Sequence, residues 1–236
     1  MYQTSDWPAA PLMSTIINKV YCIDALELLE QIPSASVDAI ITDPPYGCGT
    51  QVSGYRPREK RFREIEGVDK IRPGWIPEAY RVLRPGGAMY VFGKWVNICE
   101  WQRFINQAGF KIKNCIIWDK LRHGLGDLKG AYAPQHEMIL FAVKGRHLLR
   151  GKRPSDLIRV YQSTKDLIHP YQKPIDLIAR LIENSTSPGE VVLDPFVGSG
   201  TTAVAAQSTG RAFIACDISL EYVELARKRL AQHKLF

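Results

Sequence analysis

An acid, two prolines and an aromatic ring follow one another directly, as Asp43, Pro44, Pro45 and Tyr46. The apolar residues just before them predict a buried strand. Each proline fixes its own φ and keeps the preceding residue extended, and because neither has an N–H, the backbone there offers only carbonyl acceptors. Such a turn suits a planar amino group: the Asp43 carboxylate and the Pro44 carbonyl can each accept one N–H while Tyr46 stacks on the plane. A strand-ending turn with a capping Asp is the alternative, and these residues alone do not decide between the two.

A second segment that could bind a ligand runs from Asp194 to Thr202, with the sequence Asp-Pro-Phe-Val-Gly-Ser-Gly-Thr-Thr. A predicted strand precedes it and a predicted helix follows, so its glycines stand where backbone can approach a ligand and helix N–H groups are available. Asp217 ends the next predicted strand, where an acid can hold a ribose diol. Asp194 would repel a pyrophosphate and attract an ammonium group. The pattern therefore favours a nucleoside with an ammonium group over a nicotinamide cofactor.

The elements that must position these residues alternate between strands and helices. Short apolar runs predict the strands, and apolar residues at helical spacing predict the helices. The alternation is typical of an α/β protein with a parallel sheet, whose ligands bind at the carboxyl ends of the strands. Asp24 follows the first strand, so it is either a ligand-binding acid or the N-cap of the next helix. Strands are predicted at 19–22, 39–42, 88–92, 111–118, 136–143, 190–193 and 212–216, helices at 24–32, 75–83, 97–108, 175–184, from 203, and at 221–230, and a turn at 84–87.

Length and composition indicate one domain. The 236 residues fit a single domain over 14–236 behind a loose polar tail at 1–13. The net charge of +7 favours an anionic partner. The five cysteines include no CxxC pair, so neither a metal site nor a disulfide framework is expected. With no apolar run of membrane-spanning length and no signal pattern at the N-terminus, we expect a cytoplasmic protein.

Irregular segments interrupt the α/β pattern, and two of them are basic. Loop insertions are predicted at 47–73 and 121–134, and a further irregular segment at about 146–168. Acids accompany the basic residues of the first segment, whereas the last has no acid before Asp156. Unpaired positive blocks favour phosphate contact, and a solvated charged surface is the alternative. The candidate nucleic-acid-binding residues are Arg56, Arg58, Lys60, Arg61, Arg146, Arg150, Lys152 and Arg153.

The motif at 43–46 precedes the glycine-containing motif at 194–202, and in this order the motifs resemble those of the amino-methylating DNA methyltransferases of bacteria and phages. The arrangement is similar to their β class, in which Asp-Pro-Pro-Tyr precedes Phe-x-Gly-x-Gly, and it extends from about Val20 onward. The segments 84–87 (Arg-Pro-Gly-Gly) and 169–174 (His-Pro-Tyr-Gln-Lys-Pro) also match. Two small departures are Tyr171, where the family often has Thr, and Asp217, where it often has Glu. The resemblance implies a Rossmann-like methyltransferase fold: a mostly parallel seven-stranded sheet with helices on both faces, circularly permuted so that the catalytic half precedes the glycine-turn half.

The resemblance also implies roles for individual residues. Asp43, Pro44, Pro45 and Tyr46 would form the catalytic site that holds the target base. The implied cofactor is S-adenosylmethionine, with Asp217 on its ribose, Asp24 on the adenine side and Lys173 reaching its carboxylate. Segment 146–168 takes the target-recognition position, and the loops at 47–73 and 121–134 share the readout. The remaining implied cofactor-binding residues are Asp194, Pro195, Phe196, Gly198, Ser199, Gly200 and Thr201.

The implied activity is site-specific methylation of adenine N6 in double-stranded DNA, by base flipping and direct transfer. Asp at the first motif position favours adenine, and cytosine N4 is the alternative. An RNA methyltransferase, a protein-glutamine methyltransferase and an inactive DNA-binding homologue are further alternatives. The resemblance leaves open whether a cognate restriction endonuclease exists and whether the protein is a monomer or a homodimer. For the two half-sites to meet, the strands that end at Asp43 and Asp194 must be neighbours in the sheet.

Overall fold

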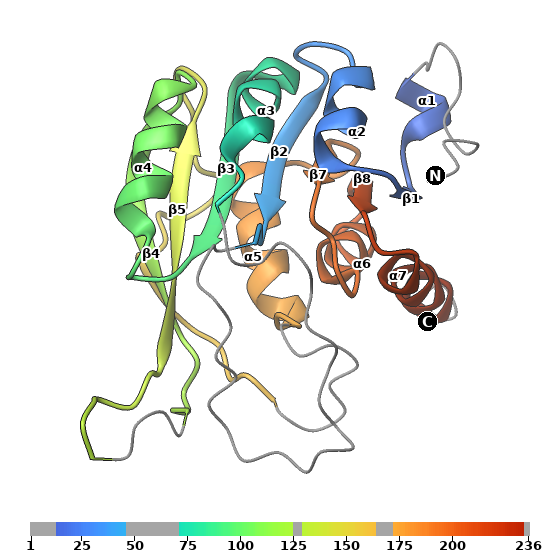
Figure 1. Ribbon diagram of the computed structural model, residues 1–236. Helices are drawn as coiled ribbons and strands as arrows, with labels where there is room; N and C mark the ends of the chain where they lie inside the picture. Colours follow the sequence, from blue (N-terminus) through green and yellow to red (C-terminus); the bar gives the residue numbers. More distant parts are fainter. Residues whose placement is uncertain (1–12, 46–70, 125–128, 164–171, 234–236) are drawn as a thin grey trace.

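The computed structural model describes residues 13–45, 71–124, 129–163 and 172–233. Its centre is one sheet of eight strands in the order β1-β8-β7-β2-β3-β5-β4-β6 (Figure 1). Every neighbouring pair is parallel except the two that involve β5, which runs antiparallel to β3 and β4. The strands are β1 (Lys19–Cys22), β2 (Val37–Thr42), β3 (Leu83–Gly93), β4 (Lys111–Asp119), β5 (His136–Val143), β6 (Leu157–Arg159), β7 (Val191–Asp194) and β8 (Ala212–Asp217).

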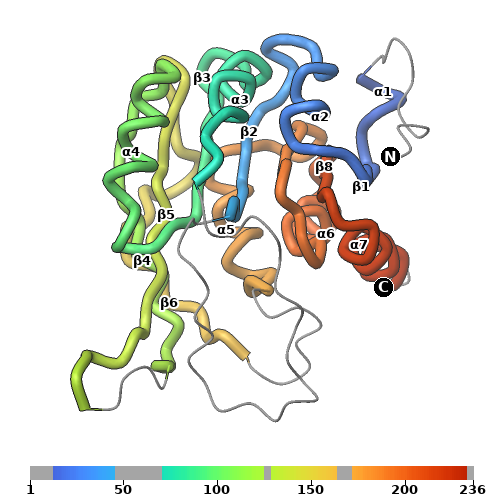
Figure 2. The backbone as a smooth tube through the Cα atoms, viewed as in Figure 1, coloured from blue at the N-terminus to red at the C-terminus, as the bar shows by residue number. Residues whose placement is uncertain are grey.

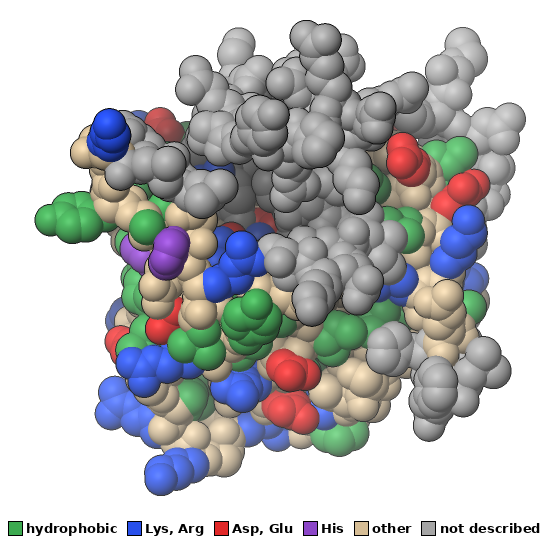
Figure 3. All heavy atoms as spheres, turned by 90° about the horizontal axis from the view of Figure 1, so that it is seen from below, with side chains coloured by type: hydrophobic (Ala, Val, Ile, Leu, Met, Phe, Trp, Pro, Cys, Tyr) green, Lys and Arg blue, Asp and Glu red, His purple; other side chains and the backbone are tan. Residues whose placement is uncertain are grey.

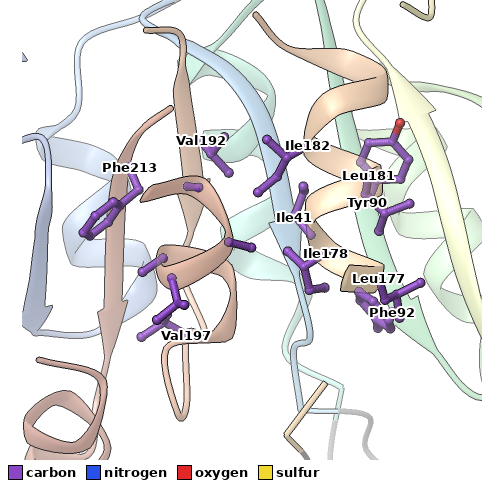
Figure 4. Packing of buried hydrophobic residues seen from close by; sticks show 14 of the residues in the cluster. Ile41, Tyr90, Phe92, Leu177, Ile178, Leu181, Ile182, Val192, Val197 and Phe213 are labelled. Atoms are coloured by element: carbon purple, nitrogen blue, oxygen red, sulfur yellow. The ribbon is translucent and has the colours of Figure 1, made fainter. Parts of the chain in front are cut away.

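Helices cover both faces of the sheet, as predicted. One apolar core lies between the strands and α2, α3 and α4, and the other lies between the strands and α5, α6 and α7. Ile40 belongs to the first core and Ile41 to the second, because successive side chains of β2 point to opposite faces. Figure 4 shows the second core, where Ile178 and Ile182 of α5 lie over Ile41. The helices are α1 (Met13–Ile16), α2 (Ala25–Gln31), η2 (Pro73–Trp75), α3 (Ile76–Val82), α4 (Ile98–Gln107), α5 (Ile175–Ser185), α6 (Thr201–Ser208) and α7 (Leu220–His233).

The predicted strand count was wrong by one. All seven predicted strands are present, and β6 adds an eighth inside the segment that was expected to be irregular. β6 has three residues, of which only Ile158 is buried. A strand this short gives no periodicity to detect in sequence. It exists because it pairs with the edge of β4, in register with Ile117 to Asp119. Helix α1, at Met13–Ile16, was likewise missed.

The predicted turn at 84–87 lies within β3, where it takes the form of a bulge. Leu83 pairs with Val37 and Ala88 pairs with Ala39, so β3 carries four residues opposite one residue of β2. The backbones approach closely here, since a Cβ on Gly87 would lie 2.9 Å from the Asp38 carbonyl oxygen. The Gly-Gly pair therefore lets β3 bend away from β2 and return to it.

The chain connections diverge between β2 and β7. After β2 the chain reaches β3 through α3 on one face, and after β7 it reaches β8 through α6 on the other face. In open α/β sheets, ligands bind in the crevice that such a divergence leaves at the carboxyl ends of the strands. β2 and β7 pair in parallel, with Ala39 opposite Val192 and Ile40 opposite Leu193. The predicted adjacency of the strands that end at Asp43 and Asp194 is therefore confirmed.

The hairpin of β4 and β5 extends beyond the rest of the sheet on the same side as these carboxyl ends (Figure 2). Its ladder continues past the strand ends, with Lys120 N donating to Gln135 O at 3.0 Å and Gly124 N donating to Pro134 O at 2.9 Å. The predicted loop 121–134 is thus the end of a hairpin, in the part that is described. None of the helices in the described residues is both long and apolar enough to cross a membrane.

At the opposite end of the sheet, a chain of hydrogen bonds ties α5 to β3. His147 Nδ1 lies 2.7 Å from the Gly86 carbonyl oxygen, which only accepts, so this nitrogen carries the proton. His147 Nε2 therefore accepts from the Ser185 hydroxyl at 3.1 Å, and Ser185 Oγ accepts from the Tyr90 hydroxyl at 2.7 Å. Burial lowers the pKa of His147 below its ordinary value, although the bond to Gly86 opposes this. Burial also raises the pKa of Tyr90 to about 12.

The lowered pKa of His147 predicts acid destabilisation. Below about pH 6.5 the unfolded chain protonates this imidazole while the folded protein resists, so the unfolded state binds more protons. The contribution to stability is complete above that pH and is lost as the pH falls, by at most about 1.4 kcal/mol per pH unit. His147→Asn keeps a donor for Gly86 without titrating, so its free energy of unfolding should fall less between pH 7.5 and 5.5 in urea titrations. If the free energy of unfolding falls equally in the native protein and in His147→Asn, the acid destabilisation does not come from His147.

Candidate active site

Four carboxylates stand at the carboxyl ends of four neighbouring strands. Asp24, Asp217, Asp194 and Asp43 follow or end β1, β8, β7 and β2, in the order of the sheet. The structure thus brings together, along one edge, four acids that the sequence singled out separately. Figure 3 views the molecule from this end, and acidic and basic side chains of the described residues are visible on it.

The two half-sites are joined directly by a side-chain hydrogen bond. Thr42 Oγ1 donates to Asp194 Oδ1 at 2.9 Å, although the two residues are 152 positions apart. Phe196 N donates to the same oxygen at 3.1 Å. Asp194 is only 4% exposed, and burial raises its pKa to about 7, although hydrogen bonds from Thr202, Phe196 and Thr42 oppose the shift. A cation placed beside Asp194 would therefore stabilise its ionised form.

Asp43 is paired with a buried cation. Lys173 Nζ lies 2.6 Å from Asp43 Oδ2 and 3.0 Å from Glu137 Oε2, and 5.0 Å above the ring of Phe92. Lys173 is 7% exposed. Burial alone would lower its pKa, but Asp43 and Glu137 outweigh burial and raise it, so the ammonium stays charged. Removing one partner of such a buried pair costs about 3–5 kcal/mol, because a charge is left uncompensated.

The glycine turn between β7 and α6 is held from behind by a buried arginine. Gly198 and Gly200 have φ of +49° and +85°, in the left-handed region that favours glycine. Arg229 of α7 donates to Ser199 O at 2.6 Å, and to Ser199 Oγ and Thr201 Oγ1 at 3.1 and 3.3 Å. A Cβ on Gly200 would lie 2.7 Å from the Cβ of Ala226, so α7 packs directly against the turn.

Asp217 and Asp24 already hold backbone groups. Asp217 Oδ2 accepts from Gly198 N at 3.0 Å and Oδ1 accepts from Ser219 N at 2.9 Å, which fixes the glycine turn to the end of β8. Burial raises the pKa of Asp217, and these bonds oppose the rise. Asp24 Oδ1 accepts from Leu26 N at 2.8 Å, so the N-cap alternative is correct. A carboxylate offers about four acceptor positions, so neither acid is thereby excluded from binding a ligand.

The other predicted cofactor residues line the same edge. Pro195 is buried and accepts from the Cys216 thiol, and Phe196 packs edge-on against Trp75 at 5.5 Å. Ser199 and Thr201 are buried in their contacts with Arg229. Pro44 is buried beside Asp43, and Pro45 is partly exposed. Tyr46 lies outside the described residues.

The predicted DNA-binding residues do not join this edge in the part that is described. Arg146 and Arg150 follow β5, whose last residue pairs with Ala88, which in turn pairs with Ala39 near the amino end of β2. That end is separated from Asp43 by the length of β2, roughly 20 Å. Arg150 N donates to Asn184 O, and its guanidinium lies 3.4 Å from Glu190, so the stretch has a compensating acid that is remote in sequence. Lys152 and Arg153 are exposed on the segment that leads to β6, and Arg56, Arg58, Lys60 and Arg61 lie outside the described residues.

Sequence reasoning missed three residues that support the site. Arg229 and Glu137 are hidden in a helix and a strand whose patterns look ordinary, and Thr42 precedes the motif that was noticed. All three have a polar or charged side chain that is buried in the fold. This burial can be recognised only from the three-dimensional structure.

Comparisons with known proteins agree on one family. A family model described as DNA methylase, for N6 and N4 methyltransferases, matches residues 37–228. The type II methyltransferase M2.DpnII of Streptococcus pneumoniae is 33% identical over 233 residues, which cover 88% of this chain and 87% of that protein. The type II methyltransferase M2.LlaDCHI of Lactococcus lactis subsp. cremoris matches with the same identity and coverage.

Solved structures share the fold. The crystal structure of the M1.HpyAVI–SAM complex superposes with a TM-score of 0.71 at 29% identity, covering 90% of this chain and 99% of that one. The PvuII DNA methyltransferase, described as cytosine-N4-specific, superposes with a TM-score of 0.70 at 19% identity over 91% of this chain and 90% of that one. At that identity the second match shows the fold alone.

The packing of α7 on the glycine turn predicts the effect of Gly200→Ala. The added methyl meets Ala226 in a backbone with φ +85°, so the turn and α7 must separate. Gly189→Ala is a matched control, because Gly189 has φ +84° with nothing within 4 Å of its Cβ position. We expect Gly200→Ala to lower the free energy of unfolding by about 1–3 kcal/mol more than the control does. Equal losses in urea titrations would show that backbone strain alone matters.

Proposed function

Since the chain belongs to the DNA methylase family of N6 and N4 methyltransferases, we propose that it methylates the N6 amino nitrogen of adenine in duplex DNA, with S-adenosylmethionine as donor. The observation that carries the proposal is the contact between the half-sites, the 2.9 Å bond from Thr42 to Asp194. It puts Asp43, the candidate base-binding acid, next to the strand end where a cationic donor would bind. One half-site without the other could not perform the transfer.

The described residues fit this donor. The buried Asp194 is suited to its ammonium group, and its pKa of about 7 would fall as the cation binds. Asp217 can accept from a ribose diol with the lone pairs that its two backbone bonds leave. The M1.HpyAVI protein, whose structure contains SAM, has the same fold. When bound, the donor supplies an electrophilic methyl group on a sulfonium.

Asp43 and Pro44 would activate the acceptor nitrogen. The lone pair of an adenine amino group is conjugated with the ring and is a poor nucleophile. Accepting its two hydrogens at the Asp43 carboxylate and the Pro44 carbonyl favours a pyramidal nitrogen, whose lone pair can point at the methyl group for in-line displacement. Catalysis is then mainly positioning and electrostatics, without a covalent enzyme intermediate.

The target base must leave the duplex to reach Asp43. In B-DNA the adenine amino group is stacked and paired, so the nucleotide is flipped into the site. Stacking on Tyr46 would offset part of the cost by about 1–3 kcal/mol. The choice of adenine rests on Asp43 at the first motif position, and cytosine N4 is the alternative within the family. The order of the half-sites along the chain also supports a circular permutation, with the catalytic half first.

Methyl transfer tests the proposal directly. Purified protein with tritiated S-adenosylmethionine should label unmethylated duplex DNA, and nucleoside analysis should find N6-methyladenine. Asp43→Ala should lower the rate by about 100-fold or more while calorimetry still detects cofactor binding. Glu30→Ala, an exposed acid on α2, is the control and should keep full activity. If the native protein transfers no label to DNA, the proposed enzymatic activity is wrong. If Asp43→Ala loses cofactor binding, Asp43 belongs to the cofactor site and not to the base site.

We propose that the duplex contacts the carboxyl edge mainly through the β4–β5–β6 side. Arg122 and Lys129 lie on the hairpin end, and Arg159 ends β6 with a side chain 66% exposed. In Figure 3, basic and histidine side chains are visible on this side of the molecule. Phosphates that flank a base flipped toward Asp43 must lie near this edge, whereas Arg150 lies at the other end of the sheet.

Salt dependence of DNA binding distinguishes the two surfaces. Replacing Arg122, Lys129 and Arg159 by Gln should weaken DNA binding and reduce the slope of log K against log salt by about 1 per lost phosphate contact. Replacing the predicted DNA-binding residues Arg150, Lys152 and Arg153 by Gln is the comparison, for which we expect the smaller change. The reverse order would assign the main phosphate contacts to the stretch predicted from sequence.

A further inference from the structure

Behind Asp43, side chains of alternating charge form a row that leads away from the site. Asp43 contacts Lys173 at 2.6 Å, Lys173 contacts Glu137 at 3.0 Å, and Glu137 contacts Lys120 at 2.7 Å. They come from the end of β2, the start of α5, β5 and the residue after β4. Their side chains are 23%, 8%, 15% and 20% exposed, in that order along the row. With all four present, the charges sum to zero, and removing any single member leaves one charge uncompensated.

Glu137 and Lys173, the two middle members of the row, each favour the charged form of the other. Burial alone would raise the pKa of Glu137, but Lys173 and Lys120 outweigh burial and lower it to about 2. Asp43 and Glu137 in turn raise the pKa of Lys173. What the row can supply is a fixed position and a fixed field.

Each member limits where the next can lie. Lys173 has a flexible four-carbon stem, and a single carboxylate would leave its ammonium several positions around Asp43. Glu137 holds the same ammonium from a β-strand, and Phe92 lies 5.0 Å beneath it, so the ammonium is fixed from three sides. Lys120 holds Glu137 at Oε1 while Lys173 contacts Oε2, so the rotation of this carboxylate is fixed as well.

We propose that Glu137 and Lys120 are positioning residues for the transfer reaction, acting through Lys173 on the Asp43 carboxylate. The inference rests on the proposed function, and it assigns Lys173 to the base-binding acid in place of the cofactor carboxylate. Glu137 also shares the Lys173 ammonium with Asp43, so that Asp43 is oriented without its charge being fully neutralised and remains a strong acceptor for an amino group.

Glu137→Gln tests the proposal with little change in shape. A small displacement of the reacting groups costs about 100-fold in rate, so kcat should fall by about that factor, with cofactor affinity unchanged in calorimetry. Glu78→Gln is the matched control, because Glu78 forms an ion pair of 2.6 Å with Arg81 far from the edge. Weakened cofactor binding with kcat preserved would overturn the proposal and assign the row to the cofactor, and a kcat equal to that of the control would overturn it as well.

Lys120→Met provides a second, milder variant in case Glu137→Gln folds poorly. Lys120 lies farthest from Asp43, so kcat should fall by less, again without loss of cofactor affinity. Because Lys120 acts only through Glu137, adding Lys120→Met to Glu137→Gln should cause no further loss of kcat. Full additivity of the two effects would show that they act independently and would contradict the row.

Crystal structures of the native protein and Glu137→Gln test the positioning without any methyl transfer. The Asp43 carboxylate should move, or split into alternate conformers, in the variant. An unmoved Asp43 would overturn the inference even if methylation proceeds. Conversely, a native protein that methylates no DNA but shows the displacement would count against the proposed function and leave the positioning intact.

Discussion

The parallel pairing of β2 with β7 is the contact on which the rest of the site depends. It joins segments about 150 residues apart. The entropy of closing a loop grows only with the logarithm of its length, so the long separation costs little more than a short one. Burial on both faces stabilises the pair, since Ile40 and Leu193 are fully buried on one face and Ile41 and Val192 on the other. Once the pair forms, its register fixes Asp43 relative to Asp194, and the Thr42 hydroxyl completes the contact.

The aspartates along this edge of the sheet have different surroundings. Asp43 is matched by a buried ammonium, Asp217 by two backbone N–H groups, and Asp194 by burial with two hydroxyls and an N–H. These surroundings differ in their effect on a carboxyl group. A neighbouring cation favours the ionised form, which accepts hydrogen bonds, whereas burial favours the protonated form and raises the pKa. Neighbouring aspartates can therefore serve a base and a cationic donor in the same crevice.

Much of this arrangement was predictable from local sequence, because the motifs sit at strand ends. The apolar runs placed β2 and β7, and the motifs placed Asp43 and the glycine turn on them. Strand β6 was not predictable, since its three residues carry no period and it forms only by pairing with β4. The basic stretch that includes Arg150 showed no compensating acid in sequence, because Glu190 approaches it only through the fold.

The partner of Lys173 could not be predicted for the same reason. Its position in the motif suggested a cofactor contact, whereas its ion pairs to Asp43 and Glu137 depend on how α5, β2 and β5 converge. Glu137 begins an apolar strand, where a charged residue is ordinarily taken as the solvent-exposed end. Long-range polar contacts leave no periodic trace in sequence, so the acids at the edge were identifiable and their counterions were not.

Because burial raises the pKa of Asp194 to about 7, binding of the proposed cationic donor would be coupled to the protonation of this carboxyl. A cation that settles beside it favours the ionised form, so on average binding expels part of a proton into the solvent. The heat measured on binding then depends on which buffer takes up that proton. Mild acidification would then work against binding of that donor, so the charge state of one aspartate would tie loading of the site to the pH of its surroundings.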